Sequence, residues 1–96
     1  MPYEKLNIAD VFIENIETGN VVEIKLLKDR ATLTNFIENQ KYIDEVCEGI
    51  PDYNIIIDGK NYYIKSTCSG IRFENHDAHL SNDDMQSIMQ IIEKSL

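Results

Sequence analysis

The sequence predicts a small α+β domain, in which two helices pack on one face of an antiparallel sheet of four or five strands in the order ββαβββα. Three observations predict this class: runs of alternating apolar and polar residues, an Asp-Gly pair between two β-rich runs, and two segments with apolar residues at helical spacing. The chain has 96 residues, a length typical of one core, so residues 1–96 are expected to form a single compact domain.

The first expected element is a β-hairpin formed by residues 8–17 and 21–28 around the loop Thr18-Gly19-Asn20. Its second arm alternates, with Val22, Ile24 and Leu26 on one face and charged residues mostly on the other. The first arm has an alternative, because its apolar residues also fit the stripe of a helix that ends at Gly19. Residues 4–17 therefore stay open between strand and helix. The residues of that stripe are Leu6, Ala9, Phe12, Ile13 and Ile16.

A helix is expected over residues 33–48, followed by Gly49 as a C-cap glycine and by Pro51. Its start is open between Thr32, Thr34 and Asn35, of which Asn35 with Glu38 resembles a capping box. The apolar side of this helix would consist of Leu33, Phe36, Ile37, Ile43, Val46 and Cys47.

A second hairpin is expected around Asp58-Gly59, because these residue types supply the positive φ angles of a tight turn between residues 55–57 and 62–68. Ser69-Gly70 then allows another reversal into residues 71–74. Tyr62 and Tyr63 are neighbours on a strand and must face opposite sides of the sheet. We expect one of them in the core and the other on the uncovered face.

The last helix has the best-defined start. Ser81 is a favourable N-cap, Asp83 and Asp84 lie where the helix dipole favours negative charge, and Leu80 and Met85 are spaced as a hydrophobic staple. The expected apolar stripe consists of Met85, Ile88, Met89, Ile92 and Leu96.

The composition excludes several partners. The chain carries 17 Asp and Glu against 9 Lys and Arg, for a net charge of −8. Nucleic acids and anionic membranes bind basic surfaces, so neither is expected as a direct partner. The two cysteines are too few for a disulfide-stapled secreted fold, and the N-terminus has no leader pattern. We expect a cytoplasmic protein with reduced thiols, and its abundance of Ile and Asn indicates a low-GC bacterium or a phage-infected bacterial host.

No motif predicts an enzyme. His76 and His79, near Cys68, are the residue types of a metal site, but in a strand residues three apart point to opposite faces. Cys47 falls on an apolar stripe, where a cysteine is usually a small buried hydrophobe. Nucleotide-binding glycine patterns are also missing. We therefore expect no catalytic residues, no metal and no cofactor.

The charge is unevenly distributed. Residues 35–58 contain six acids and one base, residues 73–96 contain five acids and one base, and residues 59–72 contain three bases and no acid. Clustered carboxylates can imitate phosphates and bind a basic protein surface, with an exposed tyrosine as an apolar anchor. The candidate partner-binding residues are Glu45, Glu48, Asp52, Asp83, Asp84 and Tyr63.

In size, acidity, Ile- and Asn-rich composition and mixed α+β pattern, the chain resembles the small phage-encoded anti-CRISPR and other anti-defence inhibitors. The resemblance is one of type and assigns no individual residue a role. It implies a non-enzymatic inhibitor that occupies the basic groove of a nucleic-acid-binding effector as a nucleic-acid mimic. Two alternatives remain. One is an assembly module that forms a homodimer through its uncovered sheet face or a strand edge, with Tyr63, Ile56 and neighbouring strand residues at the interface. The other is an antitoxin or immunity protein that neutralises a basic toxin.

Overall fold

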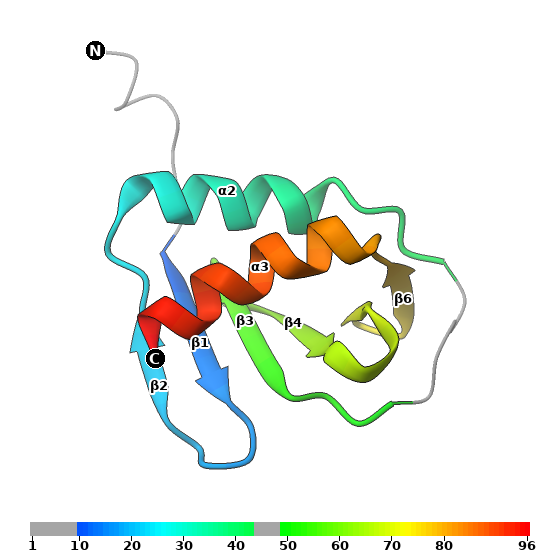
Figure 1. Ribbon diagram of the computed structural model, residues 1–96, viewed down its shortest axis with the longest axis horizontal. Coiled ribbons are helices and arrows are strands. Elements are labelled where there is room, and N and C mark those ends of the chain that lie inside the picture. The colour runs from blue at the N-terminus through cyan, green and yellow to red at the C-terminus, as the bar shows by residue number, and fades with distance from the viewer. Residues whose placement is uncertain (1–9, 44–48) are drawn as a thin grey trace.

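The computed structural model describes residues 10–43 and 49–96. These residues form a six-stranded antiparallel sheet in the order β2-β1-β3-β4-β5-β6, and the helices α2 and α3 lie side by side on one face of it (Figure 1). The expected α+β class, with both helices on one face, is confirmed. The number of strands is six rather than four or five, because residues 76–79 form a further strand.

The first hairpin consists of β1 (Val11–Asn15) and β2 (Val21–Glu23), with Ile13 opposite Val22. The helical alternative is therefore wrong for the described part of residues 4–17, and residues 4–9 lie outside the described residues. Strand alternation buries Val11 and Ile13 on the helix-covered face of the sheet. Along the edge that does not bond to β2, β1 pairs with β3. The second arm is shorter than expected, because the chain enters a helix at Leu27.

The expected helix over 33–48 is displaced in the structure. Helix α2 spans Leu27–Glu38 and buries Leu33 and Ile37, while Asn39 is its C-cap. The predicted C-cap at Gly49 is wrong, and so is the predicted capping box, because Asn35 and Glu38 lie inside the helix. Residues 44–48, with the predicted stripe residues Val46 and Cys47, lie outside the described residues.

Tertiary contacts explain the early end of α2. The Tyr42 hydroxyl donates a hydrogen bond to the carbonyl oxygen of Ile37 (2.7 Å) in the last turn. Ile43 exchanges two backbone hydrogen bonds with Asp77 of the sheet, at 2.9 and 3.0 Å. Bonding to the sheet replaces the helical bonds that the local sequence favours, and leaves Ile43 48% exposed rather than in the core.

The second hairpin is confirmed. Strands β3 (Tyr53–Ile57) and β4 (Lys60–Lys65) flank Asp58 and Gly59, whose φ angles are 52° and 78°. Strand β4 ends at Lys65 and a short 3-10 segment, Ser66–Cys68, follows it.

A reversal at Ser69 (φ 51°) leads into β5 (Gly70–Phe73), and a tight turn with Glu74 at φ 57° leads into β6 (His76–His79).

Helix α3 (Asn82–Ser95) begins as predicted, since the backbone N–H of Asp84 donates to Ser81 Oγ at 3.1 Å. Its buried face consists of Met85, Ile88, Ile91 and Ile92, so Ile91 takes the place that the pattern gave to Leu96, which is 48% exposed. The buried side chains of both helices and of the covered sheet face form one hydrophobic core.

Replacing the Ser81 cap with Ala is expected to lower the free energy of unfolding by about 1 kcal/mol, because the N–H of Asp84 loses its acceptor. Urea denaturation measures this change. Ser87→Ala is the matched control, since Ser87 lies inside α3 and bonds only the carbonyl of Asp83 in the preceding turn. The control should stay within about 0.5 kcal/mol of the wild type, and an equal loss in both variants would contradict the cap.

Candidate functional site

Two of the predicted contact carboxylates, Asp83 and Asp84, lie together in the first turn of α3. Asp83 is exposed and Asp84 is half-buried, and neither forms an ion pair with any residue of 10–43 or 49–96. Asp84 lines a hollow of about 440 Å³ against α2, together with Thr32, Asn35, Phe36, Asn39 and Gln40. A carboxylate, several amides and one aromatic ring therefore line the groove between the two helices.

Asp52, a third predicted contact residue, lies just before β3 and binds its own chain. Its Oδ2 accepts hydrogen bonds from the backbone N–H of Ser66 (3.2 Å) and from the Ser66 hydroxyl. It lines a different hollow, of about 510 Å³, beside Ile16, Glu17 and Met89. Asp52 and Asp84 thus line separate hollows, and the remaining predicted carboxylates, Glu45 and Glu48, lie outside the described residues.

The hairpin that the sequence indicates to be locally basic presents little basic surface. Lys65 is 3% exposed, and its Nζ lies 3.4 Å from Asp77 Oδ2. Arg72 donates to Asp77 Oδ1 at 2.7 Å. Asp77, one of the five acids in residues 73–96, is fully buried and therefore adds no charge to an acidic surface. Of the three bases in residues 59–72, only Lys60 is exposed.

The ion pairs determine the ionisation of Asp77. Burial alone would raise the pKa of this carboxyl, but the hydrogen bond from Arg72 and the positive charge of Lys65 outweigh burial and hold its pKa below the ordinary value of 3.8. Asp77 is therefore a charged, structural residue on the outer face of the sheet, and it pairs with a buried lysine, Lys65, and a partly exposed arginine, Arg72.

The expected division of the two tyrosines is confirmed. Tyr62 is 4% exposed on the helix-covered face, where its ring stacks on Phe73 with centroids 4.5 Å apart. Tyr63 lies on the opposite face and is half-buried, opposite Asn54 and Arg72 on the neighbouring strands. Phe12 and Ile56 are paired on that same face, so an apolar strip crosses the uncovered side of the sheet.

Two carboxylates near the aromatic residues were not among the predicted contacts. Burial raises the pKa of Tyr62, and the negative charges of Glu38 and Glu74 raise it further. Both glutamates are exposed, Glu38 at the end of α2 and Glu74 in the β5–β6 turn. Their proximity to one ring depends on the register of β4, β5 and β6 and on the residue at which α2 ends. The spacing of acidic residues along the chain predicts neither of these.

Cys68 is disulfide-bonded, so the expected reduced thiol is wrong for this residue. The second cysteine in the sequence, Cys47, lies outside the described residues. Disulfides persist chiefly in oxidising compartments. Reduced thiols were one reason to expect a cytoplasmic location, and Cys68 does not support that expectation. Within the described ranges, no helix has the length and apolarity to cross a bilayer.

His76 and His79 are both exposed at the two ends of β6. As predicted for a strand, residues three apart point to opposite faces of the sheet. Within the described part of the chain, no three His, Cys, Asp or Glu side chains are grouped so as to hold a metal ion.

Comparisons of the chain with protein-family models, with curated proteins and with solved structures each find no match.

Proposed function

We propose that this protein is a non-enzymatic inhibitor or regulator that binds a basic surface of a nucleic-acid-binding protein, with its carboxylates as phosphate surrogates. The supporting observation is that several cations of the chain are already paired with carboxylates of the same chain. Arg30, Lys65, Arg72 and Lys94 each form an ion pair with an Asp or Glu of the same chain. The exposed carboxylates outside these ion pairs give the surface an excess of negative charge. Among the described residues, they are those of Glu17, Glu38, Asp58, Glu74, Asp83 and Glu93.

The groove between α2 and α3 supports Asp83 and Asp84 as the first contacts. Asp84 at its margin can accept hydrogen bonds from a guanidinium or ammonium group, while Phe36 offers an apolar surface to the aliphatic part of the same side chain. The amides of Asn35, Asn39 and Gln40 add neutral polar partners. Such a groove suits an Arg or Lys side chain that otherwise holds a phosphate.

A competition experiment tests the function. Purified bacterial DNA-binding effectors are bound to labelled DNA at low salt, the protein is added, and the release of DNA is followed by fluorescence anisotropy. We expect release by at least one effector, with an inhibition constant that weakens as salt increases. Lack of release from every effector, or release indifferent to salt, contradicts the proposal.

The residues are tested by neutralisation. The double variant D83N/D84N is expected to weaken inhibition about tenfold or more, because each charged contact contributes on the order of 1 kcal/mol. The variant E17Q/E93Q has the same change in charge at two other exposed glutamates and should inhibit nearly as well as the wild type. Equal losses in both variants would reject the α2–α3 groove as the contact.

An antitoxin or immunity protein would bind a basic toxin by the same physics, and the identity of the partner separates the two functions. Including a basic toxin nuclease among the effectors tests this alternative directly.

A further inference from the structure

The two edges of the sheet differ in whether another segment of the chain forms hydrogen bonds with them. Next to β6, Ile43 exchanges two backbone hydrogen bonds with Asp77 and so occupies part of that edge. At the other edge, β2 pairs with β1 on one side, and no strand within residues 10–43 and 49–96 pairs with its other side. An edge strand with unpaired N–H and C=O groups is a template for pairing with another chain.

The hydrogen bonds of the hairpin show which groups of β2 point outward. The carbonyl of Asn20 and the N–H of Ile24 bond to β1. In an antiparallel ladder the intervening odd-numbered residues direct their N–H and C=O groups away from the partner strand. Within β2 (Val21–Glu23) the outward groups are therefore those of Val21 and Glu23. Continuing the alternation past Ile24, with Leu26 still extended, directs the groups of Lys25 the same way, and all three residues have exposed side chains. We refer to residues 21–26 as the β2 edge.

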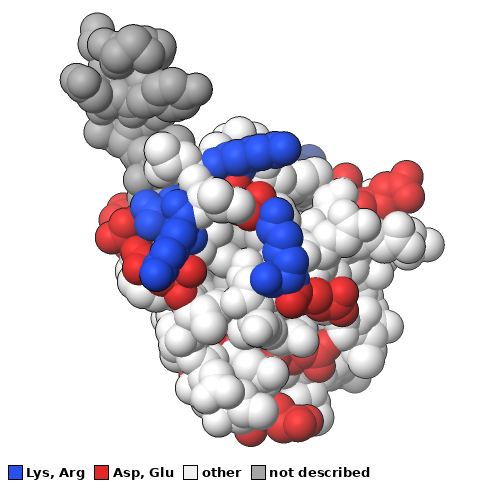
Figure 2. All heavy atoms as spheres, turned by 60° about the vertical axis from the view of Figure 1, so that its left-hand side comes forward, with Lys and Arg blue, Asp and Glu red and all other residues white. Residues whose placement is uncertain are grey.

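Exposed apolar side chains gather around the β2 edge. Val21 and Leu96 are 53% and 48% exposed and line one hollow of about 280 Å³. Leu26 and Leu27, at the start of α2, are 61% and 50% exposed. Figure 2 shows this side of the molecule, where Lys and Arg side chains lie next to Asp and Glu above a broad uncharged surface. Exposed apolar side chains beside an unpaired strand edge favour an interaction site there.

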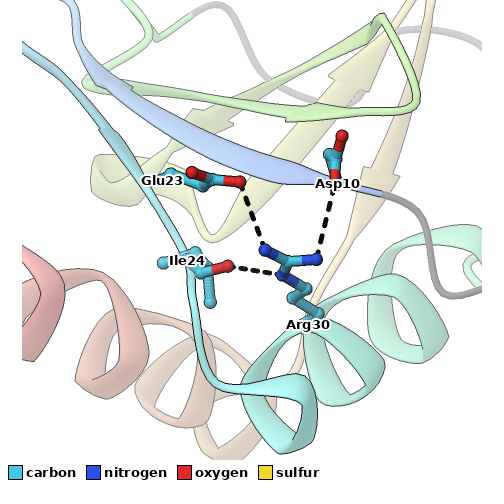
Figure 3. A network of polar contacts seen from close by, with 4 residues as sticks. All are labelled: Asp10, Glu23, Ile24 and Arg30. Atoms are coloured by element: carbon cyan, nitrogen blue, oxygen red, sulfur yellow. Dashed lines mark hydrogen bonds and ion pairs between the residues drawn. The ribbon is translucent and has the colours of Figure 1, made fainter.

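Arg30 holds the β2 edge in position. Its Nε donates to the carbonyl of Ile24, while its two terminal nitrogens lie 3.3 Å from Asp10 Oδ1 and 3.2 Å from Glu23 Oε2 (Figure 3). The Arg30 side chain is only 15% exposed, so this contact ties the end of β2 to α2. A strand fixed in its extended form loses less conformational entropy when it pairs with another strand.

We propose that a second copy of this chain pairs antiparallel with the β2 edge, about a two-fold axis that passes by Ile24. In this register Glu23 of each copy lies opposite Lys25 of the other, and both residues direct their N–H and C=O groups toward the partner. The other registers that align outward groups are less favourable. Centring the axis on Glu23 or on Lys25 places like charges opposite each other, and centring it on Val22 places Glu23 opposite Val21. Opposite charges in cross-strand pairs stabilise a sheet and like charges destabilise it.

The same register explains the exposed leucine. On the helix-covered side of the sheet, Leu26 of each copy lies opposite Val22 of the other, next to the buried Ile24. The pairing thus gives an apolar partner to a side chain that is 61% exposed in the single chain. The two six-stranded sheets would join into one continuous sheet across the axis.

Sedimentation equilibrium of the full chain tests the proposal. We expect a reversible dimer in the range below about 1 mM, with a dissociation constant that rises with salt. Lys25→Glu replaces two attractive pairs with two repulsive ones and is expected to weaken association by at least about tenfold. Lys60→Glu makes the same change of charge at an exposed residue of β4, which lies three strands away from β2 in the sheet, and it should leave the dimer unchanged.

A mixing experiment separates pairing from simple loss of charge. Glu23→Lys and Lys25→Glu should each be monomeric alone, yet form a heterodimer when mixed. The first variant carries positive charges at both positions 23 and 25, and the second carries negative charges at both, so every cross-strand pair in the mixed dimer joins opposite charges. Circular dichroism checks that Glu23→Lys, which loses its contact with Arg30, still folds. If it does not, Leu26→Ser provides the second test and should also weaken the dimer.

A wild-type chain that stays monomeric to about 1 mM overturns the proposal. It is equally overturned by a dimer that Lys25→Glu and Lys60→Glu weaken alike, or by one that Leu26→Ser leaves intact. These results do not depend on DNA-binding effectors, so the dimer and the proposed inhibition can fail independently.

Discussion

Replacing Asp77 with Ala is expected to lower the free energy of unfolding by about 3–5 kcal/mol, because it removes one partner of a buried ion-pair network. Lys65 is 3% exposed and loses a carboxylate oxygen at 3.4 Å, while Arg72 loses an acceptor at 2.7 Å. In a domain of this size such a loss is a large fraction of the total stability. Urea or thermal denaturation at neutral pH measures it.

Asp10→Ala provides the control. Asp10 also pairs with an arginine, Arg30, but its side chain is 70% exposed. Water screens an exposed pair, and the expected cost is below about 1 kcal/mol. Similar losses in the two variants would show that the Asp77 network contributes no more than a surface pair.

The same network predicts how stability depends on pH. The pKa of Asp77 is lower in the folded chain than its ordinary value of 3.8, so below that value the unfolded chain binds more protons. The stabilisation from Asp77 is thus fully present above an unfolded pKa of about 3.8 and is lost as the pH falls through the folded pKa. The difference in unfolding free energy between wild type and Asp77→Asn should shrink as the pH is lowered from about 5 to about 2.

Ile37→Ala is expected to cost about 2–5 kcal/mol of unfolding free energy, because Ile37 is fully buried and its truncation leaves a cavity under α2. Ile43→Ala is the matched control, since the same atoms are removed from a residue that is 48% exposed beyond the helix. We expect it to cost about 0.5 kcal/mol. The sequence pattern places both isoleucines on one buried stripe, so equal costs, measured by denaturation, would favour the longer helix over the observed one.

Part of the candidate site was predictable from the sequence. Asp83 and Asp84 follow a cap residue, and this local signal places them in the first turn of α3. Tyr62 and Tyr63 are adjacent on a strand, so their opposite orientations follow from the two-residue period. The approach of Glu38 and Glu74 to Tyr62 was not predictable, because it joins α2, β4 and the β5–β6 turn.

The β2 edge shows a related limit. The alternation of Val22, Ile24 and Leu26 predicted a strand arm over residues 21–28, of which only Val21–Glu23 form a strand, and it predicted the same environment for all three residues. Ile24 is 2% exposed and Leu26 is 61% exposed, because Leu26 is already the N-cap of α2. Periodicity assigns a residue to a face, whereas burial depends on which element covers that face.

Local signals in the sequence are sufficient for three features: the Asp58-Gly59 turn, the Ser81 cap, and the alternation of the strands that form the first two hairpins. The sequence also determines the class, since alternating strands and amphipathic helices of these lengths can bury their apolar sides only by packing together. Three further features follow from contacts across the fold: the end of α2, the strand at residues 76–79, and the pairing of Lys65 and Arg72 with a buried Asp77. Each of these features depends on hydrogen bonds or ion pairs between residues that are distant in the chain. Such contacts outweigh the local preference for helix or strand, and they produce no periodic pattern in the sequence.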